Sequence, residues 1–388
     1  MKKLAKHMQH IQPFRVMALL AEAKKLEAEG RTIVHMEVGE PDFITPEPVI
    51  ESGIQSLKQG KTHYTPASGD PALRAAISQY YQDQFNVKVE DDRILITPGA
   101  SGALQLALSV LVNPGDQVMM ADPGYPCNRN FVYLLSGKVN AVNVSADTGF
   151  QITTELLKQN WTKATKVLLL ASPSNPTGTL INKDEMKSIL DFVAQQNGIV
   201  IVDEIYQGLT YGDAGFSALE MSENIFVINS FSKYFGMTGW RVGWIVAPED
   251  YVSDIDKLAQ NLYLAAPTPS QEAALAAFKP ETLVILEQRR KAYQQRRDYL
   301  IPELKALGFV IEIVPQGAFY IYADCSALTS DSFQFCHDVL HKAGVAITPG
   351  LDFGSNQPER YVRFAYTTNM EKLHEAVSRL KTYIEDVK

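Results

Sequence analysis

Residues 166–203 read KVLLLASPSNPTGTLINKDEMKSILDFVAQQNGIVIVD, and a fold class can be predicted from this stretch alone. Its ends, 166–171 and 199–203, are apolar runs of strand length, and segment 183–196 between them has the pattern of an amphipathic helix. Fully apolar strands joined by amphipathic helices indicate a mainly parallel sheet with helices on both faces. Ligands bind at the carboxyl ends of such strands, so we expect functional residues directly after these runs.

The same alternation continues on both sides of this stretch. Further strand candidates lie at 94–97, 117–121, 138–144, 225–231 and 242–247, and helical patterns lie at 103–111 and 155–159. The sequence therefore predicts an α/β fold whose larger domain holds a mainly parallel seven-stranded sheet flanked by helices.

From about Ser270 the pattern changes to that of a smaller α/β domain. A long helical region, 271–306, is followed by expected strands at 310–315, 318–323 and 361–365 and expected helices at 332–343 and 372–384. We expect a continuous helix to join the two domains. Near the N-terminus a helix over 16–29 should stop at Gly30, since glycine commonly ends helices.

The composition narrows the class of protein. With 46% hydrophobic and 21% charged residues, the 388-residue chain has the balance of a globular protein, which excludes a disordered one. The net charge of −8 argues against a nucleic-acid or anionic-membrane surface. The clearly apolar runs are far shorter than the roughly 20 residues of a membrane helix. The three cysteines predict neither a disulfide framework nor a metal site and favour a reducing compartment such as the cytoplasm.

The strongest chemical signal is Ser230-Phe231-Ser232-Lys233, with Arg241 eight residues later. A lysine directly after an apolar strand is poorly placed for a solvated charge, and a dry site beside other cations lowers its pKa from about 10.4. A neutral lysine amine can form a Schiff base with an aldehyde. Arg241 can offer a fork of donors to a phosphate, and the hydroxyls of Ser230 and Ser232 add neutral donors. Taken alone, the pattern also fits an ordinary solvated lysine.

Polar residues follow two of the other predicted strands. Asp203 ends the run 199–203, where its carboxylate can pair with a pyridinium nitrogen, and Tyr206 can place a hydroxyl beside the same ring. The alternative for Asp203 is a helix N-cap, and Glu204 fits a solvated or supporting neighbour. After the run 166–171, Asn175 in SNPTG can donate to a ring oxygen or can be a plain turn asparagine.

Two further loops complete the set. In ITPGASG, small residues including Ala100 and Ser101 open a predicted helix, so backbone N–H groups there can meet a phosphate. Tyr125, in DPGYP, can stack on a flat ring, although a lone tyrosine at such a place is often only a turn residue.

Together these motifs resemble the class I/II aminotransferases of fold type I, which depend on pyridoxal 5′-phosphate (PLP). The resemblance covers nearly the whole chain, and its specificity lies in the order and intervals of the motifs. They are VGEPDF at 38–43, HYTPASG at 63–69, ITPGAS, DPGYP, SNPTG, DEIY, SFSK, GWRVGW, GAFY at 317–320, ITPGLDFG at 347–354 and YVRFAY at 361–366. The family implies an N-terminal segment 1–45 packed on the small domain, a large PLP-binding domain 46–275 and a small domain 276–388.

The resemblance also implies a role for each motif residue. Lys233 would bond to the cofactor and shuttle protons, Asp203 would meet the ring nitrogen, and Asn175 and Tyr206 would meet its phenolic oxygen. Tyr125 would stack on the ring. The cofactor phosphate would be held by Ala100, Ser101, Ser230, Arg241 and, from a partner subunit, Tyr64, which implies a homodimer. The substrate α-carboxylate would be bound by Gly39, Asn175 and Arg363, where Arg363 can instead be a strand-edge arginine paired with an acid.

The resemblance implies ping-pong transfer of an amino group between an amino acid and a 2-oxo acid. A PLP-dependent carbon–sulfur β-lyase or amino-acid decarboxylase is the enzymatic alternative, because one cofactor site serves many reactions. A PLP-sensing regulator is the non-enzymatic alternative, but such proteins carry an added DNA-binding region, for which we expect no room before Val38. Arg15 and Lys61 are candidate cations for an acidic substrate. Phe14, Tyr263 and the run 16–20 instead favour a neutral or aromatic one.

Overall fold

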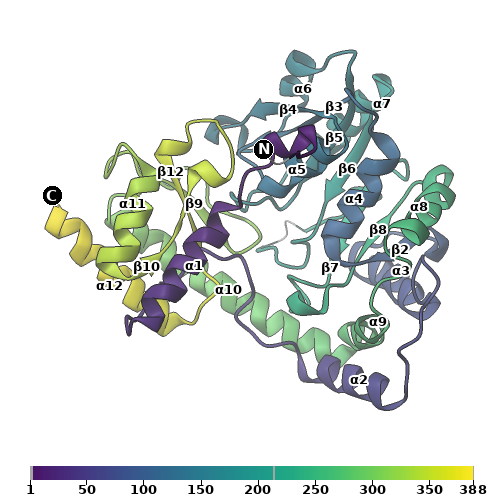
Figure 1. Cartoon of the computed structure of the whole chain (residues 1–388), viewed down its shortest axis with the longest axis horizontal. Helices are drawn as coiled ribbons and strands as arrows, with labels where there is room; N and C mark the ends of the chain where they lie inside the picture. Colours follow the sequence, from purple (N-terminus) through teal and green to yellow (C-terminus); the bar gives the residue numbers. More distant parts are fainter. Residues whose placement is uncertain (1–2, 213–214, 388) are drawn as a thin grey trace.

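The computed structural model describes residues 3–212 and 215–387. Met1, the first residue of the predicted segment 1–45, and Lys388, the last residue of the predicted domain 276–388, lie outside the described residues. Its largest element is a seven-stranded sheet, seen to the right in Figure 1. The strands lie in the order β2, β8, β7, β6, β5, β3, β4. Their bounds are β2 Ile94–Thr97, β3 Gln117–Asp122, β4 Lys138–Asn143, β5 Thr165–Ala171, β6 Ile199–Asp203, β7 Phe226–Ser230 and β8 Gly243–Val246.

These strands confirm the seven strand candidates of the sequence. Strand β8 runs antiparallel to both of its neighbours, β2 and β7, whereas the remaining pairs are parallel. The sheet is therefore mainly parallel, and the carboxyl ends of β5, β6 and β7 meet at one edge. The loops that follow these strands hold Asn175 and Lys233, and Asp203 ends β6 itself.

Alternate side chains of the central strands enter two separate cores. On β5, Leu168 and Leu170 face the core built with α7 (Lys183–Gln195). Val167 and Leu169 face the core built with α4 (Gly99–Leu111) and α8 (Glu249–Leu262). Such alternation follows from the two-residue period of a strand. The helices around the sheet are α2 Glu47–Lys58, α3 Pro71–Phe85, α4 Gly99–Leu111, α5 Pro126–Leu134, α6 Thr154–Asn160, α7 Lys183–Gln195, α8 Glu249–Leu262 and α9 Thr268–Leu275.

A second, smaller body of structure lies beside the sheet, to the left in Figure 1. It contains an antiparallel sheet in the order β11, β12, β9 and a parallel pair of β1 with β10. Helix α10 runs into it from the region of α9, so that Leu286 packs in the large core and Leu300 in the small one. The bounds are α1 Arg15–Ala28, β1 Val34–His35, α10 Pro280–Ala306, β9 Tyr320–Asp324, α11 Ser332–Asp338, β10 Val345–Ala346, β11 Thr348–Pro349, β12 Tyr361–Ala365 and α12 Met370–Val387. The proposed domain boundaries at residues 46 and 276 stay predictions.

Some expectations for this body were wrong. Residues 310–315 form no strand, and Val310 makes only a single bridge to Asp324. The expected helical region 271–306 is interrupted: α9 ends at Leu275, and a short 3-10 helix follows at Ala276–Phe278. Lys279 has the extended backbone that a residue before proline favours, and Pro280 then begins α10. Strand β9 begins at Tyr320 rather than at 318, since Ala318 has a left-handed backbone with φ of 56°.

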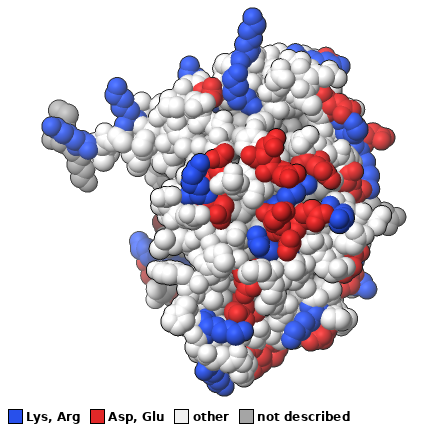
Figure 2. Space-filling model, turned by 90° about the vertical axis from the view of Figure 1, so that its right-hand side faces the viewer, with Lys and Arg blue, Asp and Glu red and all other residues white. Residues whose placement is uncertain are grey.

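Charged side chains of both signs lie interspersed on the face drawn in Figure 2, where an acidic cluster occupies the middle. This is the mixed surface that a net charge of −8 suggests. A helix both long and apolar enough to cross a membrane does not occur in residues 3–212 and 215–387.

Candidate active site

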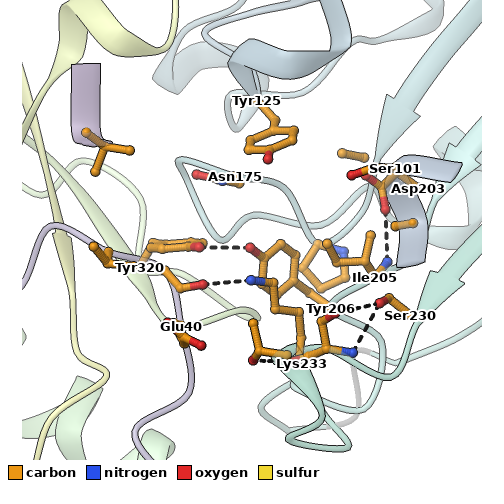
Figure 3. Close-up of a pocket in the computed structure, with 18 of the residues that line it drawn as sticks. Glu40, Ser101, Tyr125, Asn175, Asp203, Ile205, Tyr206, Ser230, Lys233 and Tyr320 are labelled. Carbon is orange, nitrogen blue, oxygen red and sulfur yellow. Dashed lines mark hydrogen bonds between the residues drawn. The ribbon is translucent and has the colours of Figure 1, made fainter. Parts of the chain in front are cut away.

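One cavity of about 270 Å³ collects the predicted residues at the carboxyl edge of the large sheet. Figure 3 shows them converging from several elements. The cavity is lined by Gly39, Ala100, Ser101, Tyr125, Asn175, Asp203, Tyr206, Ser230, Lys233, Arg241 and Arg363, which is every predicted site residue except Tyr64. The structure thus brings together side chains that are separated by up to 324 positions in the sequence.

Lys233 lies in the loop after β7, and its Nζ donates a hydrogen bond to the carbonyl oxygen of Gly39 at 2.7 Å. Burial lowers the pKa of Lys233 to about 8; the positive charges of Arg363 and Arg241 act in the same direction, while Glu40 and Asp203 oppose them. A lysine with a pKa near 8 holds a substantial fraction of neutral amine at physiological pH. That is the form needed for nucleophilic attack and for taking up a proton.

Asp203 ends β6 and is buried, with Oδ1 accepting a hydrogen bond from the Ile205 amide at 3.0 Å. Burial raises the pKa of this carboxyl to about 7, although the Ile205 amide and the charge of Lys233 both oppose the rise. A buried carboxyl with a raised pKa is stabilised as an anion when a cation is placed beside it. The site therefore favours a protonated ring nitrogen at this position.

Glu204 does not line the cavity and is not the solvated neighbour that the sequence suggested. It is 1% exposed, and its Oε1 accepts hydrogen bonds from the Ala218 amide at 2.7 Å and the Ser217 hydroxyl at 3.2 Å. Burial raises the pKa of Glu204 to about 8. Successive residues of a strand end face opposite ways, which separates the two carboxyls.

A group of hydrogen-bond donors surrounds the first turn of α4. The N-cap Pro98 offers this turn no side-chain acceptor, so the helix presents free N–H groups at Ala100 and Ser101. Gly99 has a φ of +71°, and a Cβ there would lie 2.5 Å from Nη2 of Arg241. Backbone donors, the positive end of a helix and a guanidinium are groups that can together bind a phosphate.

Arg363 is the deeply buried cation of the cavity. Its Nη1 donates to Oδ1 of Asn175 at 2.9 Å, and its Nη2 donates to the backbone oxygen of Glu37. The guanidinium stacks on the ring of Tyr320, with Cζ 4.3 Å from the centroid. Across the described chain no carboxylate lies within ion-pair distance of Arg363, although the side chain is only 3% exposed. A buried cation held by neutral groups is suited to bind an anionic ligand.

The sequence left open the alternative that Arg363 lies at a strand edge, and this alternative is wrong. It lies in β12, the central strand of the smaller sheet, opposite Thr348 of β11 and Tyr322 of β9. The alternative of a structural ion pair with an acid is therefore wrong for the residues that the structure describes.

Tyr206 and Tyr320 link the two sheets across the cavity. Their hydroxyl oxygens are hydrogen-bonded at 2.8 Å, and a dashed line in Figure 3 marks this bond. A Cβ on Gly39 would overlap the Tyr320 hydroxyl, so position 39 must be glycine for this pair to form. Tyr320 is thus part of the site, and sequence reasoning left it out although it lies in the quoted motif GAFY.

Comparisons with known proteins agree with this geometry. The family described as "Aminotransferase class I and II" matches residues 31–380. The chain belongs to this family. Class I and II aminotransferases depend on PLP, so this chain is a PLP-dependent enzyme that moves amino groups between amino acids and 2-oxo acids.

Relatives of this aminotransferase carry names with different substrates. The chain is 38% identical to a (5-formylfuran-3-yl)methyl phosphate transaminase of Methanocaldococcus jannaschii, over 98% of this chain and 99% of the relative. It is 36% identical to a valine–pyruvate aminotransferase of Mycobacterium tuberculosis, over 96% and 97%. The crystal structure of an aspartate aminotransferase from Thermus thermophilus with maleate superposes with a TM-score of 0.93 at 31% identity, covering 98% of this chain and all of the other.

The residues present fit PLP. The raised pKa of buried Asp203 suits the ring nitrogen, the donors around Ala100 and Arg241 suit the phosphate, and the lowered pKa of Lys233 suits bonding to the aldehyde. Tyr125 lines the same cavity, from where its ring can cover the cofactor. We therefore expect Lys233 to hold PLP covalently.

Four predicted residues lie elsewhere in this single chain. Tyr64 is 81% exposed, Arg15 lies over the Phe333 ring outside the cavity, and Lys61 pairs with Glu272 at 3.0 Å. Tyr263 packs against the large core instead. Of the apolar set expected to contact substrate, Phe14, Val16 and Met17 do line the cavity. Glu40 does so as well, and its only sequence signal was its place in the motif VGEPDF.

The described ranges contain no cluster of three or more histidine, cysteine or acidic side chains arranged to hold a metal ion. The polar groups of the cavity include amides, hydroxyls, the Lys233 amine and two guanidinium groups, which suit organic anions, together with the carboxylates of Glu40 and Asp203.

Proposed function

We propose that this aminotransferase acts on amino acids with neutral apolar or aromatic side chains. The observation that carries the proposal is the lining of the cavity. Its cations in the described chain are Lys233, Arg241 and Arg363, and the remaining space is bounded by Phe14, Val16, Met17, Val38 and the carboxylate of Glu40. Once Lys233, Arg241 and Arg363 serve the cofactor and the α-carboxylate, no lining cation of the described residues is left for an acidic side chain.

The proposed roles follow from the contacts. Arg363 binds the α-carboxylate with its planar fork, together with Asn175, on which it already rests, and with Gly39. PLP supplies the electron sink when it is bound. Lys233, with its lowered pKa, would take the proton from the substrate Cα and return it to the cofactor carbon on the other side of the amine nitrogen. Asp203 keeps the ring nitrogen protonated, and Tyr206 holds its hydroxyl at the phenolic oxygen.

The phosphate is proposed to be held by residues of two loops of the same subunit and by one residue of a second subunit. These residues are Ala100, Ser101, Ser230, Arg241 and the partner's Tyr64. The support for a homodimer is that several large apolar side chains face solvent in the single chain: Tyr64 is 81% and Ile44 75% exposed, and Leu57 of α2 is also exposed. A dimer in which such side chains adjoin one another would bury them, as association surfaces do. We also propose a cytoplasmic location, which the three free cysteines support.

A panel of amino donors with 2-oxobutanoate, an acceptor without a second carboxylate, tests the substrate class. Phenylalanine, leucine and valine should be converted with higher kcat/KM than aspartate, and the products should be the matching 2-oxo acid and 2-aminobutanoate. Release of pyruvate and ammonia would identify a β-lyase instead, and release of carbon dioxide a decarboxylase. A preference for aspartate would contradict the proposed substrate class.

Hybrid dimers test the placement of Tyr64. Mixing Tyr64→Phe subunits with Lys233→Ala subunits gives one undamaged site per hybrid if Tyr64 acts across the interface, so activity exceeds that of either parent. If Tyr64 acts in its own subunit, each hybrid site carries a defect and no activity is restored. A monomer in sedimentation at assay concentration would contradict the dimer outright.

A further inference from the structure

The first turn of α1 obtains its hydrogen-bond acceptors from a residue more than 300 positions away. The N-cap Phe14 supplies no side-chain acceptor, so the first amides of the helix need partners from elsewhere. The carboxylate of Asp352 accepts from the Arg15 amide through Oδ1 at 3.0 Å and from the Val16 amide through Oδ2 at 3.2 Å. A carboxylate at a helix N-terminus also interacts favourably with the helix dipole.

That first turn forms one wall of the cavity. Phe14, Val16 and Met17 line it, and the Phe14 ring meets the Tyr125 ring edge-on at a centroid distance of 6.2 Å. The three side chains are uncharged and apolar. Where α1 begins therefore sets how much apolar space is open beside Tyr125.

Asp352 is itself held in place by contacts with the large sheet. It is 6% exposed, and the neighbouring Phe353 accepts hydrogen bonds through its backbone oxygen from Nη2 of Arg129 at 2.6 Å and from the Gly124 amide at 2.9 Å. Two residues on, the Ser355 hydroxyl donates to the Asp122 carboxylate at 2.9 Å. Asp122 ends β3, so the loop that carries Asp352 is fixed relative to the cofactor end of the cavity.

We propose that Asp352 is a positioning residue that determines substrate specificity by fixing the apolar wall of Phe14, Val16 and Met17. It does not line the cavity and acts only through the two amides of α1. The ligand class that depends on it is the carboxylate with an apolar side chain of several carbons, because only such a side chain reaches the wall. This inference rests on the proposed function, in which Arg363 binds the carboxylate.

The substitution Asp352→Asn tests this role with little change of shape. The amide oxygen of the introduced asparagine can serve one N–H, but its NH₂ group faces the other N–H as a second donor. The charge at the helix terminus is also lost. Lys233, Asp203 and Arg363 lie on other elements, so their contacts should persist. Asp331→Asn is a matched control, because Asp331 accepts from the Phe333 and Gln334 amides at the start of α11, away from the cavity.

The experiment measures binding of two unreactive carboxylates to the PLP-loaded enzyme by calorimetry. Acetate reaches only the carboxylate site, whereas 3-phenylpropanoate also reaches the wall. We expect Asp352→Asn to weaken 3-phenylpropanoate roughly 3- to 30-fold, as for loss of a helix cap, and to leave acetate within about 2-fold. Asp331→Asn should change neither, and the visible spectrum of the bound cofactor should be the same in all three proteins. The kcat/KM for phenylalanine should fall relative to that for alanine.

Every other outcome would overturn a specific part of the proposal. Equal weakening of both carboxylates would place the effect at Arg363 and overturn the role of Asp352, as would no weakening at all. A wild-type enzyme that binds 3-phenylpropanoate no better than acetate would overturn the apolar substrate class itself. If Asp352→Asn does not fold, Arg15→Pro removes one donated N–H at a helix position that favours proline. Arg15→Pro should also weaken 3-phenylpropanoate more than acetate, by a smaller factor than Asp352→Asn. Unchanged affinities in Arg15→Pro would overturn the role of Asp352.

Discussion

The two ends of the cavity are built in different ways. At the cofactor end, Asp203 ends β6, and Lys233 and Arg241 lie in the connection between β7 and β8, at most 38 positions from Asp203. At the substrate end, Phe14, Tyr320 and Arg363 come from opposite ends of the chain and meet only in the folded protein. The cofactor end is thus fixed by one rigid sheet, while the substrate end can change through several separate segments without disturbing it.

The charges at the two ends differ in the same way. The cofactor end combines a buried acid of raised pKa with a lysine of lowered pKa, whereas the substrate end holds a buried guanidinium on neutral partners. Each end should therefore fail differently when it is altered. A change at the cofactor end should abolish chemistry, and a change at the substrate end should reduce affinity or selectivity.

The largest effect is expected for Lys233→Ala at the cofactor end. It removes the group that we propose moves the proton, and loss of such a group should lower kcat by roughly 10²- to 10⁴-fold. Borohydride treatment followed by peptide mass spectrometry should place the cofactor on Lys233 in the wild type and on no lysine in the variant. Lys187→Ala, which removes an exposed ion pair with Asp191 on α7, is the control. Cofactor found on another lysine in the variant would show that the assignment is wrong.

Arg363→Lys tests the substrate end. A lysine cannot reproduce the planar fork, so losing one charged hydrogen bond should cost about 1.5–3 kcal/mol, or roughly 10- to 100-fold in kcat/KM for amino acids. The spectrum of the bound cofactor should stay normal, and amines without a carboxylate should react as before. Arg360→Lys, which alters a partly exposed pair with Asp324, is the matched control. A sharp fall in melting temperature with unchanged kinetics would instead assign Arg363 a structural role.

A titration of protein stability against pH tests the raised pKa of Glu204, the buried carboxyl that follows Asp203 in the sequence. Burial raises the pKa of Glu204 from the ordinary 4.5 to about 8 in the cofactor-free protein. Between these two pH values the folded protein therefore binds a proton at Glu204 that the unfolded protein has lost. The free energy of unfolding should therefore fall as pH rises from 4.5 to 8, by about 1.4 kcal/mol per unit from this group.

Glu204→Gln should remove the Glu204 part of that slope and leave the part due to Asp203, whose pKa is raised to about 7. Urea unfolding at about pH 5, 6, 7 and 8 measures the slope, and the Glu204 part alone persists between pH 7 and 8. Glu223→Gln, at a side chain that is 80% exposed, should leave the slope unchanged. An unchanged slope in Glu204→Gln would mean that this carboxyl ionises normally in the folded protein.

The smallest effect is expected for Tyr320→Phe, which removes the hydroxyl between the two ends. The loss of one hydrogen bond to Tyr206 corresponds to about 0.5–1.5 kcal/mol, or roughly 2- to 10-fold in kcat/KM. The pH midpoint of the cofactor absorbance should also move, because Tyr206 loses its partner. Tyr299→Phe, on α10 beside His374, serves as control. A loss beyond about 100-fold, well above the effect of one hydrogen bond, would show that Tyr320 contacts the reacting atoms.

The sequence predicted the cofactor end better than the substrate end, for a physical reason. The central strands β5, β6 and β7 are largely apolar runs, and a proposed site residue ends or follows each of them within a few positions, as Asp203 ends β6 and Asn175 follows β5. Local pattern and local chemistry coincide there.

The substrate end has no comparable local signal. The two-residue strands β1, β10 and β11 are too short to show a period, and the contact of Arg363 with Asn175 joins residues 188 positions apart. The hydroxyl pair of Tyr206 and Tyr320 likewise depends on how two sheets pack. Only the family motifs placed Arg363 at this end, and its buried, uncompensated charge became visible in the structure.

The pairing of β1 with β10 has a consequence for how the protein is made. Val34 pairs with Val345, and the amide of Arg15 reaches Asp352, 337 residues later. At roughly 5–20 residues per second, synthesis leaves α1 and β1 without their partners for some tens of seconds. During that time the apolar face of α1, with Ala23 and Leu26, is open to chaperones and to other nascent chains. We expect ribosome-bound chains to resist protease at the large sheet early, and at residues 15–36 only after residues 345–352 have left the ribosome.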